Sequence, residues 1–212
     1  MALDPRRAAL VELLAGRGAL RFGDFTLKSG RRSPYFINLG SVCQGGDLAA
    51  LGAAYADAIA ERFPAADVIF GPAYKGIPLA LAAAAAWQAR CGRAIGWAFD
   101  RKEAKTHGDG GLLVGAPLAG ARVVIVDDVI TAGTALRESL ARIAPTGAQV
   151  LGAVVAIDRQ ERGEDGRTAV QAMAADGLAV APVVTVSEAA DHLLALGRLA
   201  AGERQRIAEH LR

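Results

Sequence analysis

An unbroken run of four β-branched apolar residues constrains the fold of this chain more than any other feature of its sequence. The run, residues 123–126, is typical of a strand buried on both faces, as in a parallel sheet that helices cover. Asp127 and Asp128 follow it directly, and residues 131–134 read Thr-Ala-Gly-Thr. Apolar residues then recur at helical spacing up to Pro145. The stretch therefore predicts a buried strand, an acidic pair, a small-residue loop and a helix.

The loop after this strand has the features of an anion site. In open α/β sheets, ligands bind beyond the carboxyl ends of the strands, and a glycine-containing loop that enters a helix presents backbone N–H groups to an anion. Carboxylates at the same place favour a ligand that also carries hydroxyl groups, or a divalent cation held through water, as Mg²⁺ usually is. A sugar phosphate meets both conditions. The alternative is an ordinary strand-to-helix turn that ends in aspartate.

Other apolar runs predict further units of the same kind. Strands are expected at 67–70, 93–99, 149–157 and 180–186. Helices are expected at 47–63 with Asp47 as its N-cap, at 77–90, from a Ser187 cap to Leu196, and at 203–211. Because strand-like runs are followed by a loop and a helix, we expect one α/β domain with a central parallel sheet and its functional loops on one edge.

The N-terminal segment predicts a smaller element. Asp4 and Pro5 are typical of a helix start. Residues 20–27 and 35–39 indicate two short strands, and the basic turn between them has the composition of a solvated hairpin tip. Residues 100–111 are polar and rich in glycine, so we expect a loop that stays mobile until a ligand orders it.

Composition narrows the class of protein. The 212 residues are 52% hydrophobic and 22% charged, which is typical of a globular chain with one sizeable core. The first residues lack the apolar core of a signal peptide, so we expect a cytoplasmic protein with no membrane association. Cys43 and Cys91 follow no metal-ligand spacing and are expected to be free thiols. A net charge of +2 is too small to indicate a nucleic-acid partner.

Lysine is used sparingly. Of 24 basic residues only four are lysines, namely Lys28, Lys75, Lys102 and Lys105, and all lie in glycine-containing or charge-dense loops. This distribution favours sites that need a compact, mobile ammonium group in place of a planar guanidinium. The alternative is that these four lysines are present by chance and mark no site.

Five separated motifs, which span nearly the whole chain, carry a resemblance to a known family. Residues 123–135 resemble the loop of type I phosphoribosyltransferases that binds phosphoribosyl pyrophosphate (PRPP). Four further segments are similar to those of orotate phosphoribosyltransferases in particular: 25–36, 71–78, 100–111 and 158–163. The resemblance implies the type I phosphoribosyltransferase fold in a single domain, 1–212, with a small hood contributed by about residues 1–40.

The resemblance also implies which residues act. The PRPP-binding set is Lys28, Tyr74, Lys75, Arg101, Lys102, Lys105, His107, Asp127, Asp128, Val129, Ile130, Thr131, Ala132, Gly133, Thr134 and Ala135. The orotate-binding set is Phe36, Ile37, Tyr74, Lys75, Thr131 and Arg159, with Arg159 on the orotate carboxylate. The catalytic set is Lys105, His107, Asp127 and Asp128. From the residues alone, a surface salt bridge would be the simpler role for Arg159.

The implied cofactor is Mg²⁺, held mainly by PRPP and water near Asp127 and Asp128, with no direct protein ligand. The implied assembly is a homodimer whose active sites are shared across the interface through the loop at 100–111. Three positions depart from the family pattern. Ile37 stands where a second aromatic residue is common, Thr106 where an acidic residue is common, and Asp109 where a glutamate is common.

The activity implied by the resemblance is transfer of the phosphoribosyl group from PRPP to orotate, in pyrimidine biosynthesis. Two alternatives remain at this stage. A phosphoribosyltransferase for a purine base would share residues 127–134 but has no evident need for Lys28, Arg159 and the polar loop together. A regulatory protein that senses PRPP would need a nucleic-acid surface, for which the sequence offers no spare segment.

Overall fold

The computed structural model describes residues 3–26, 30–105 and 111–212, and for residues 104 and 105 it describes the backbone alone. Its centre is a six-stranded sheet in the order β5-β4-β3-β6-β7-β8. The strands are β3 (Val68–Gly71), β4 (Gly96–Lys105), β5 (Gly111–Gly115), β6 (Arg122–Ile130), β7 (Gln149–Asp158) and β8 (Val180–Thr185). All neighbours in the sheet pair in parallel except β4 and β5, which are antiparallel.

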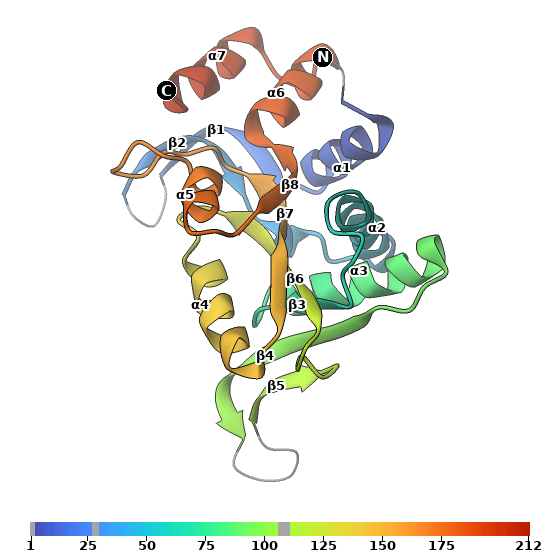
Figure 1. Cartoon of the computed structure of the whole chain (residues 1–212). Helices are drawn as coiled ribbons and strands as arrows, with labels where there is room; N and C mark the ends of the chain where they lie inside the picture. The colour runs from blue at the N-terminus through green and yellow to red at the C-terminus, as the bar shows by residue number, and fades with distance from the viewer. Residues whose placement is uncertain (1–2, 27–29, 106–110) are drawn as a thin grey trace.

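Helices cover both faces of this sheet (Figure 1). They are α1 (Pro5–Gly16), α2 (Gly45–Arg62), α3 (Gly76–Cys91), α4 (Thr134–Ile143), α5 (Ala169–Ala175), α6 (Val186–Ala195) and α7 (Ala201–His210), with short 3-10 turns at Leu39–Ser41 and Ala144–Thr146. Side chains of α1, α2, α3 and α6 join one hydrophobic core, and those of α4 and α5 join a second core on the opposite face.

Strand β6 shows why the valine-rich run controls the fold. Val124 and Val126 belong to the core under α2 and α3, whereas Val123 and Ile125 belong to the core under α4, and all four are fully buried. A strand with apolar side chains on both faces is stable only where helices cover both faces. The structure thus confirms the α/β class and the mostly parallel central sheet expected from the sequence.

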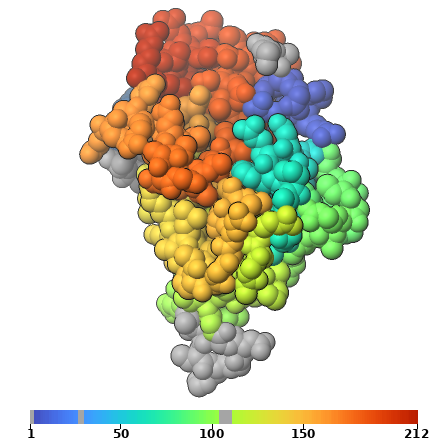
Figure 2. All heavy atoms as spheres, viewed as in Figure 1, coloured from blue at the N-terminus to red at the C-terminus, as the bar shows by residue number. Residues whose placement is uncertain are grey.

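A two-stranded antiparallel hairpin, β1 (Leu20–Thr26) and β2 (Arg32–Ile37), forms the hood. It lies beside α7 at the end of the molecule that holds the C-terminus, while β4 and β5 lie at the other end (Figures 1 and 2). Because α7 packs on β2, the last helix of the chain supports the hood.

The prediction for the polar segment 100–111 was wrong over part of its length. Strand β4 continues to Lys105, where a loop was expected, and β5 begins at Gly111. The two strands pair through their backbones, with Asp100 opposite Leu113 and Lys105 opposite Gly111. Backbone pairing at a sheet edge requires no apolar side chains, so polarity alone did not reveal the strand. Residues 106–110 lie outside the described residues.

Two predicted helix caps were also wrong. Helix α2 begins at Gly45 with Gln44 as N-cap, and Asp47 lies in its first turn, where Arg17 Nε is 2.6 Å from its Oδ2. Helix α6 is capped by Thr185, two residues before the expected Ser187. Thr185 and Glu188 form a reciprocal capping box, which satisfies two backbone N–H groups and is therefore the stronger start signal. Helix α5 was not predicted.

No helix among residues 3–26, 30–105 and 111–212 is long and apolar enough to cross a membrane.

Gly152 in β7 provides a test of this packing. A Cβ atom there would lie 2.4 Å from Phe63 Cζ and 2.6 Å from the Ala179 carbonyl oxygen. We expect Gly152→Ala to lower the free energy of unfolding by about 1–3 kcal/mol, measured by urea denaturation, because the backbone cannot move aside between β6 and β8. Gly45→Ala, where a Cβ would meet no atom within 4 Å, is the control and should change the midpoint little. Equal midpoints for the two variants would contradict this view of the core.

Candidate active site

The carboxyl ends of β3, β6 and β7 bring three loops to one edge of the sheet. Around the end of β6 lies a cavity of about 340 Å³, lined by predicted PRPP-binding residues that include Asp127, Thr131, Gly133 and Thr134. A second cavity, of about 450 Å³, lies toward the end of β7 and is lined by Arg159, Arg31 and again Thr131. The two cavities therefore adjoin at Thr131.

The acidic pair lies inside β6, which continues to Ile130, and each carboxylate is bound by a backbone amide. The Asp128 amide donates to Asp127 Oδ1 at 2.9 Å, and the Val129 amide donates to Asp128 Oδ1 at 2.9 Å. Lys75, from the loop after β3, approaches Asp128, with Nζ 2.6 Å from Oδ2. The structure therefore brings together one cation and two carboxylates predicted from separate motifs.

Asp127 has a perturbed charge state. Burial, and next the neighbouring charge of Asp128, raise the pKa of Asp127 from 3.8 to about 6. Below it, the Tyr55 hydroxyl donates to the Asp127 carbonyl oxygen at 2.6 Å, which fixes the strand at this point. A half-buried carboxylate with a like charge beside it costs stability, and such arrangements concentrate at functional sites.

The small-residue loop between β6 and α4 is held tightly. Gly133 caps α4 with φ of 75°, and a Cβ at this residue would lie 2.7 Å from Met173 Sδ, so the position requires glycine. Arg137 Nη1 donates to the Ala132 carbonyl oxygen at 2.8 Å, while its Nε and Nη2 donate to Asp176. A fixed loop at a helix N-terminus can bind a phosphate through its backbone amides.

The loop after β3 depends on close backbone contact. A Cβ at Gly71 would lie 2.0 Å from the Gly76 carbonyl oxygen, so no side chain fits there. The peptide bond between Ala73 and Tyr74 is cis. The Ala73 amide donates to Asp100 Oδ1 at 2.6 Å, and the other oxygen of Asp100 is bound by Arg142. The loop is thus anchored to β4 and α4 through one buried carboxylate.

Tyr74, in the loop after β3, and Lys102, in β4, are in contact at the protein surface. The Tyr74 side chain is 66% exposed, and Lys102 Nζ lies 4.8 Å from the centre of its ring. Arg101 Nη1 donates to the Gly111 carbonyl oxygen at 3.2 Å, which joins β4 to β5. The side chain of Lys105 and the whole of Lys28 and His107 lie outside the described residues, so their predicted roles stay predictions.

The hood residues Phe36 and Ile37 are placed differently from the other predicted residues. Ile37 is buried in the main core, while Phe36 packs on Phe25 with ring centres 5.7 Å apart and under the Arg21 guanidinium. Neither residue lines the cavities at the ends of β6 and β7. Their assignment to the orotate site also stays a prediction.

Arg159 is buried, so it does not form the surface salt bridge that was the simpler expectation. The residue is 8% exposed, and its guanidinium is bound by Glu161, which also accepts a hydrogen bond from the Tyr35 hydroxyl at 3.0 Å. The sequence analysis did not single out Glu161, Tyr35, Tyr55 or Arg137 as site residues. Buried Tyr35 and Tyr55 carry hydroxyl groups that need partners, which is the signal that could have found them.

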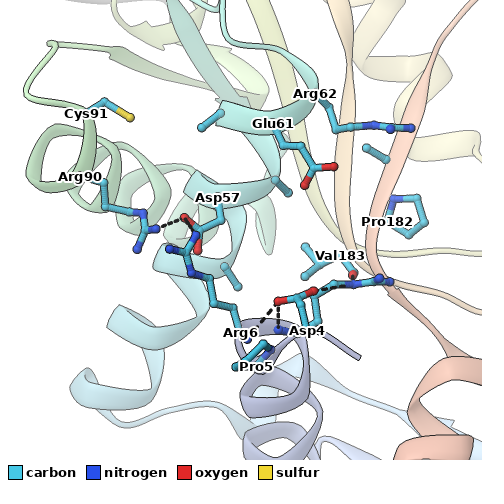
Figure 3. A pocket seen from close by; sticks show the side chains of 15 residues that line it. Asp4, Pro5, Arg6, Asp57, Glu61, Arg62, Arg90, Cys91, Pro182 and Val183 are labelled. Atoms are coloured by element: carbon cyan, nitrogen blue, oxygen red, sulfur yellow. Dashed lines mark hydrogen bonds and ion pairs between the residues drawn. The ribbon is translucent and has the colours of Figure 1, made fainter. Parts of the chain in front are cut away.

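A larger cavity, of about 980 Å³, lies elsewhere, among α1, α2, the end of α3 and β8. Figure 3 shows Arg6 and Arg90 converging on Asp57, with Arg6 Nη1 3.2 Å from Asp57 Oδ1. Arg6 and Arg90 thus pair with Asp57, and no predicted site residue lines this cavity. Among the described residues, no group of three or more histidine, cysteine, aspartate or glutamate side chains could hold a metal ion.

Comparison with known proteins agrees with this geometry. Residues 46–176 match the family model of the phosphoribosyl transferase domain. An orotate phosphoribosyltransferase of Thioalkalivibrio sulfidiphilus is 54% identical over 184 residues, which cover 86% of each chain. One from Xanthomonas euvesicatoria pv. vesicatoria is 54% identical over 193 residues, covering 90% of this chain and 87% of the relative.

Solved structures give the same result. The orotate phosphoribosyltransferase of Francisella tularensis superposes with a TM-score of 0.83 at 35% identity, covering 95% of this chain and 96% of that one. The Mycobacterium tuberculosis enzyme in complex with PRPP superposes with a TM-score of 0.67 at 25% identity, covering 87% and 99%. The chain belongs to the phosphoribosyltransferase family, among its orotate phosphoribosyltransferases.

Proposed function

We propose that this chain transfers the 5-phosphoribosyl group from PRPP to orotate, giving orotidine 5′-monophosphate and diphosphate for pyrimidine biosynthesis. The observation that carries the proposal is the pair of cavities that adjoin at Thr131. One contains an acidic residue and a phosphate-type loop, as a ribose phosphate requires, and the other contains the buried guanidinium of Arg159, as an acceptor carboxylate requires.

The chemistry needs no enzyme nucleophile. As the bond from C1 of the ribose to the diphosphate breaks, positive charge develops on the ring, and a ring nitrogen of orotate forms the new bond to C1. In this proposal Asp127 and Asp128 bind the ribose hydroxyls and place negative charge beneath the ring. The loop at 131–134 binds the 5′-phosphate, while Lys75, Arg101, Lys102, Lys105 and His107 neutralise the departing diphosphate.

Lys75 is suited to a change of partner. Its side chain is 62% exposed although Nζ contacts Asp128, so the ammonium group can turn toward a diphosphate without leaving a buried cavity. Lys102 stands on the exposed Tyr74 ring at the same edge. Tyr74 in turn offers a ring face on which a planar base can stack.

The site also suits Mg²⁺ in the manner expected from the sequence. Mg²⁺ is commonly bound by one or two carboxylates together with substrate phosphates and water, and the pair Asp127 and Asp128 supplies that number of carboxylates. When bound with PRPP, the ion would neutralise diphosphate charge. Its main ligands in this proposal are PRPP and water.

A purine acceptor fits the site less well. A purine base has no carboxylate to pair with Arg159, so the guanidinium that lines the second cavity would make no charged contact with such an acceptor. For a PRPP-sensing regulator no structural observation among the described residues provides support. Both substrates are small molecules, so we propose a cytoplasmic enzyme that needs neither a membrane nor a nucleic-acid partner.

We further propose a homodimer, formed through the outer face of α3. This helix has no charged residue before Arg90, so it is apolar all round, which is typical of a helix covered on all sides. Pro78, Leu81 and Ala85 lie along its outer face, and all three are exposed, Leu81 by 40%. In this proposal the two copies share their active sites across the interface.

The first test is catalytic. The protein is incubated with PRPP, Mg²⁺ and orotate, and the loss of orotate absorbance is followed, with adenine, hypoxanthine and uracil in parallel. We expect consumption of orotate that requires both PRPP and Mg²⁺. Turnover of another base alone would keep the PRPP site and refute the acceptor assignment, and binding of PRPP without turnover would favour the regulator.

Asp127→Asn should trade activity for stability. The pKa of Asp127 is raised to about 6 in the folded protein, so the protonated side chain favours folding below pH 3.8. This contribution is lost as the pH rises through 6, because the buried side chain must then carry a charge. We expect turnover to fall by at least tenfold, and the melting temperature at pH 7.5 to rise by about 2–4 °C for each kcal/mol regained. The gain should shrink at pH 4.5.

The control for this prediction is Asp128→Asn, which removes the like charge but keeps Asp127 buried and leaves Lys75 without its carboxylate partner, so it should raise the melting temperature less than Asp127→Asn does. A stability gain for Asp127→Asn that is equal at both pH values would show that charge is not its cause.

Leu81→Glu tests the dimer. A buried charge on the outer face of α3 should convert the dimer to a monomer in size-exclusion chromatography with light scattering, because an interface rarely tolerates an unpaired carboxylate. Leu196→Glu is the matched control, since Leu196 is 48% exposed at the end of α6. A dimer that survives Leu81→Glu would exclude this face, and a monomeric wild type would overturn the proposal.

A further inference from the structure

One carboxylate at the end of β7 holds together groups from three distant parts of the chain. Glu161 Oε1 accepts hydrogen bonds from Arg159 Nη2 at 2.5 Å, from Arg159 Nε at 3.1 Å and from the Tyr35 hydroxyl at 3.0 Å. Glu161 Oε2 is bound by Arg31 of the hood. The Glu161 and Arg159 side chains are 12% and 10% exposed, so the contact between them is largely shielded from water, whereas Arg31 is exposed.

The contacts on Arg159 are arranged in a way that leaves one edge of its guanidinium available. Nε and Nη2 are both engaged by Glu161, whereas Nη1 makes no hydrogen bond to any residue that the structure describes. The flat face of the guanidinium lies 5.2 Å from the centre of the Tyr35 ring. Arg159 is therefore held on one edge and one face, and the residue lines the cavity that also contains Thr131.

The last helix of the chain, α7, packs against this cluster through His210. The His210 ring meets the Tyr35 ring edge-on, with centres 5.7 Å apart and an angle of 84° between the planes. His210 Nε2 is buried and lies 3.8 Å from Glu161 Oε1. Contact with α7 thus restricts the movement of the Tyr35 and Glu161 side chains.

The charge state of Glu161 agrees with this role. Burial alone would raise the pKa of Glu161, but hydrogen bonds from Arg159 and Tyr35 and the charges of Arg159 and Arg31 outweigh it and lower the pKa. Glu161 is therefore ionised at neutral pH. With two guanidinium groups and one carboxylate, the cluster keeps a net positive charge for an anionic ligand.

We propose that Glu161 is a positioning residue for the acceptor carboxylate: it holds Arg159 by two nitrogens so that Nη1 faces the substrate, and it holds the hood over the same cavity through Arg31. The inference rests on the proposed function, because it takes the ligand of Arg159 to be the carboxylate of orotate. A preorganised arginine loses little conformational freedom on binding, so it discriminates in favour of a carboxylate-bearing base.

The test is a comparison of Michaelis constants. We expect Glu161→Gln to raise KM for orotate about tenfold while KM for PRPP changes less than about twofold, because Gln keeps the shape but not the charge that orients Arg159. Arg31→Gln, on a side chain 53% exposed and therefore safe for folding, should raise KM for orotate about threefold. Glu164→Gln, an exposed residue of the same loop, is the matched control and should change neither constant.

A double variant separates positioning from mere packing. Arg159→Gln should raise KM for orotate by at least tenfold, and adding Glu161→Gln should raise it further by no more than the roughly threefold expected for loss of the Arg31 contact, because the carboxylate otherwise acts through Arg159. An unchanged or lower KM for orotate in Glu161→Gln would overturn the inference, since Glu161 would then only compete with the substrate. No effect of Arg159→Gln would refute the acceptor assignment of the proposed function itself, and the inference with it.

Discussion

The parallel pairing of β6 between β3 and β7 is the constraint on which the rest of the structure depends. It requires apolar side chains on both faces of β6, and it places the three following loops at one edge of the sheet. Lys75 reaches Asp128 only because the strands that precede them end side by side. The loops need little further support, and each is tied by one or two hydrogen bonds to a neighbouring element.

Those ties are made by buried charged groups in several places. Asp100 anchors the loop after β3, and Glu161 anchors the arginine after β7, each with a guanidinium group as partner. Asp127 differs, because its like-charged neighbour and burial raise its pKa to about 6. The scaffold thus keeps one carboxylate under strain at the place where positive charge would develop during the reaction, a cost that the large apolar cores can offset.

The molecule also draws on segments that are distant in sequence. The hood is a separate hairpin, and α7 supports it from the other end of the chain. Tyr35, Glu161 and His210 form one cluster although they come from β2, the loop after β7 and the last helix. The proposed acceptor site at the end of β7 is therefore connected to the hood and to the last helix, whereas the loop at 131–134 is supported by α4 and α5, through Arg137, Asp176 and Met173.

The sequence by itself determined the strand–loop–helix units, because the alternation of β-branched runs with glycine-containing loops depends on local geometry and burial. It also indicated Asp127 and the loop at 131–134, since chemistry-bearing residues stood out at the end of a strand, whereas a substrate contact for Arg159 was indicated by the family resemblance. It could not reveal that polar residues 100–105 extend β4 along β5, that Thr185 caps α6, or that Glu161 holds Arg159. Those features depend on which backbone or side chain lies opposite, and only the tertiary structure decides that.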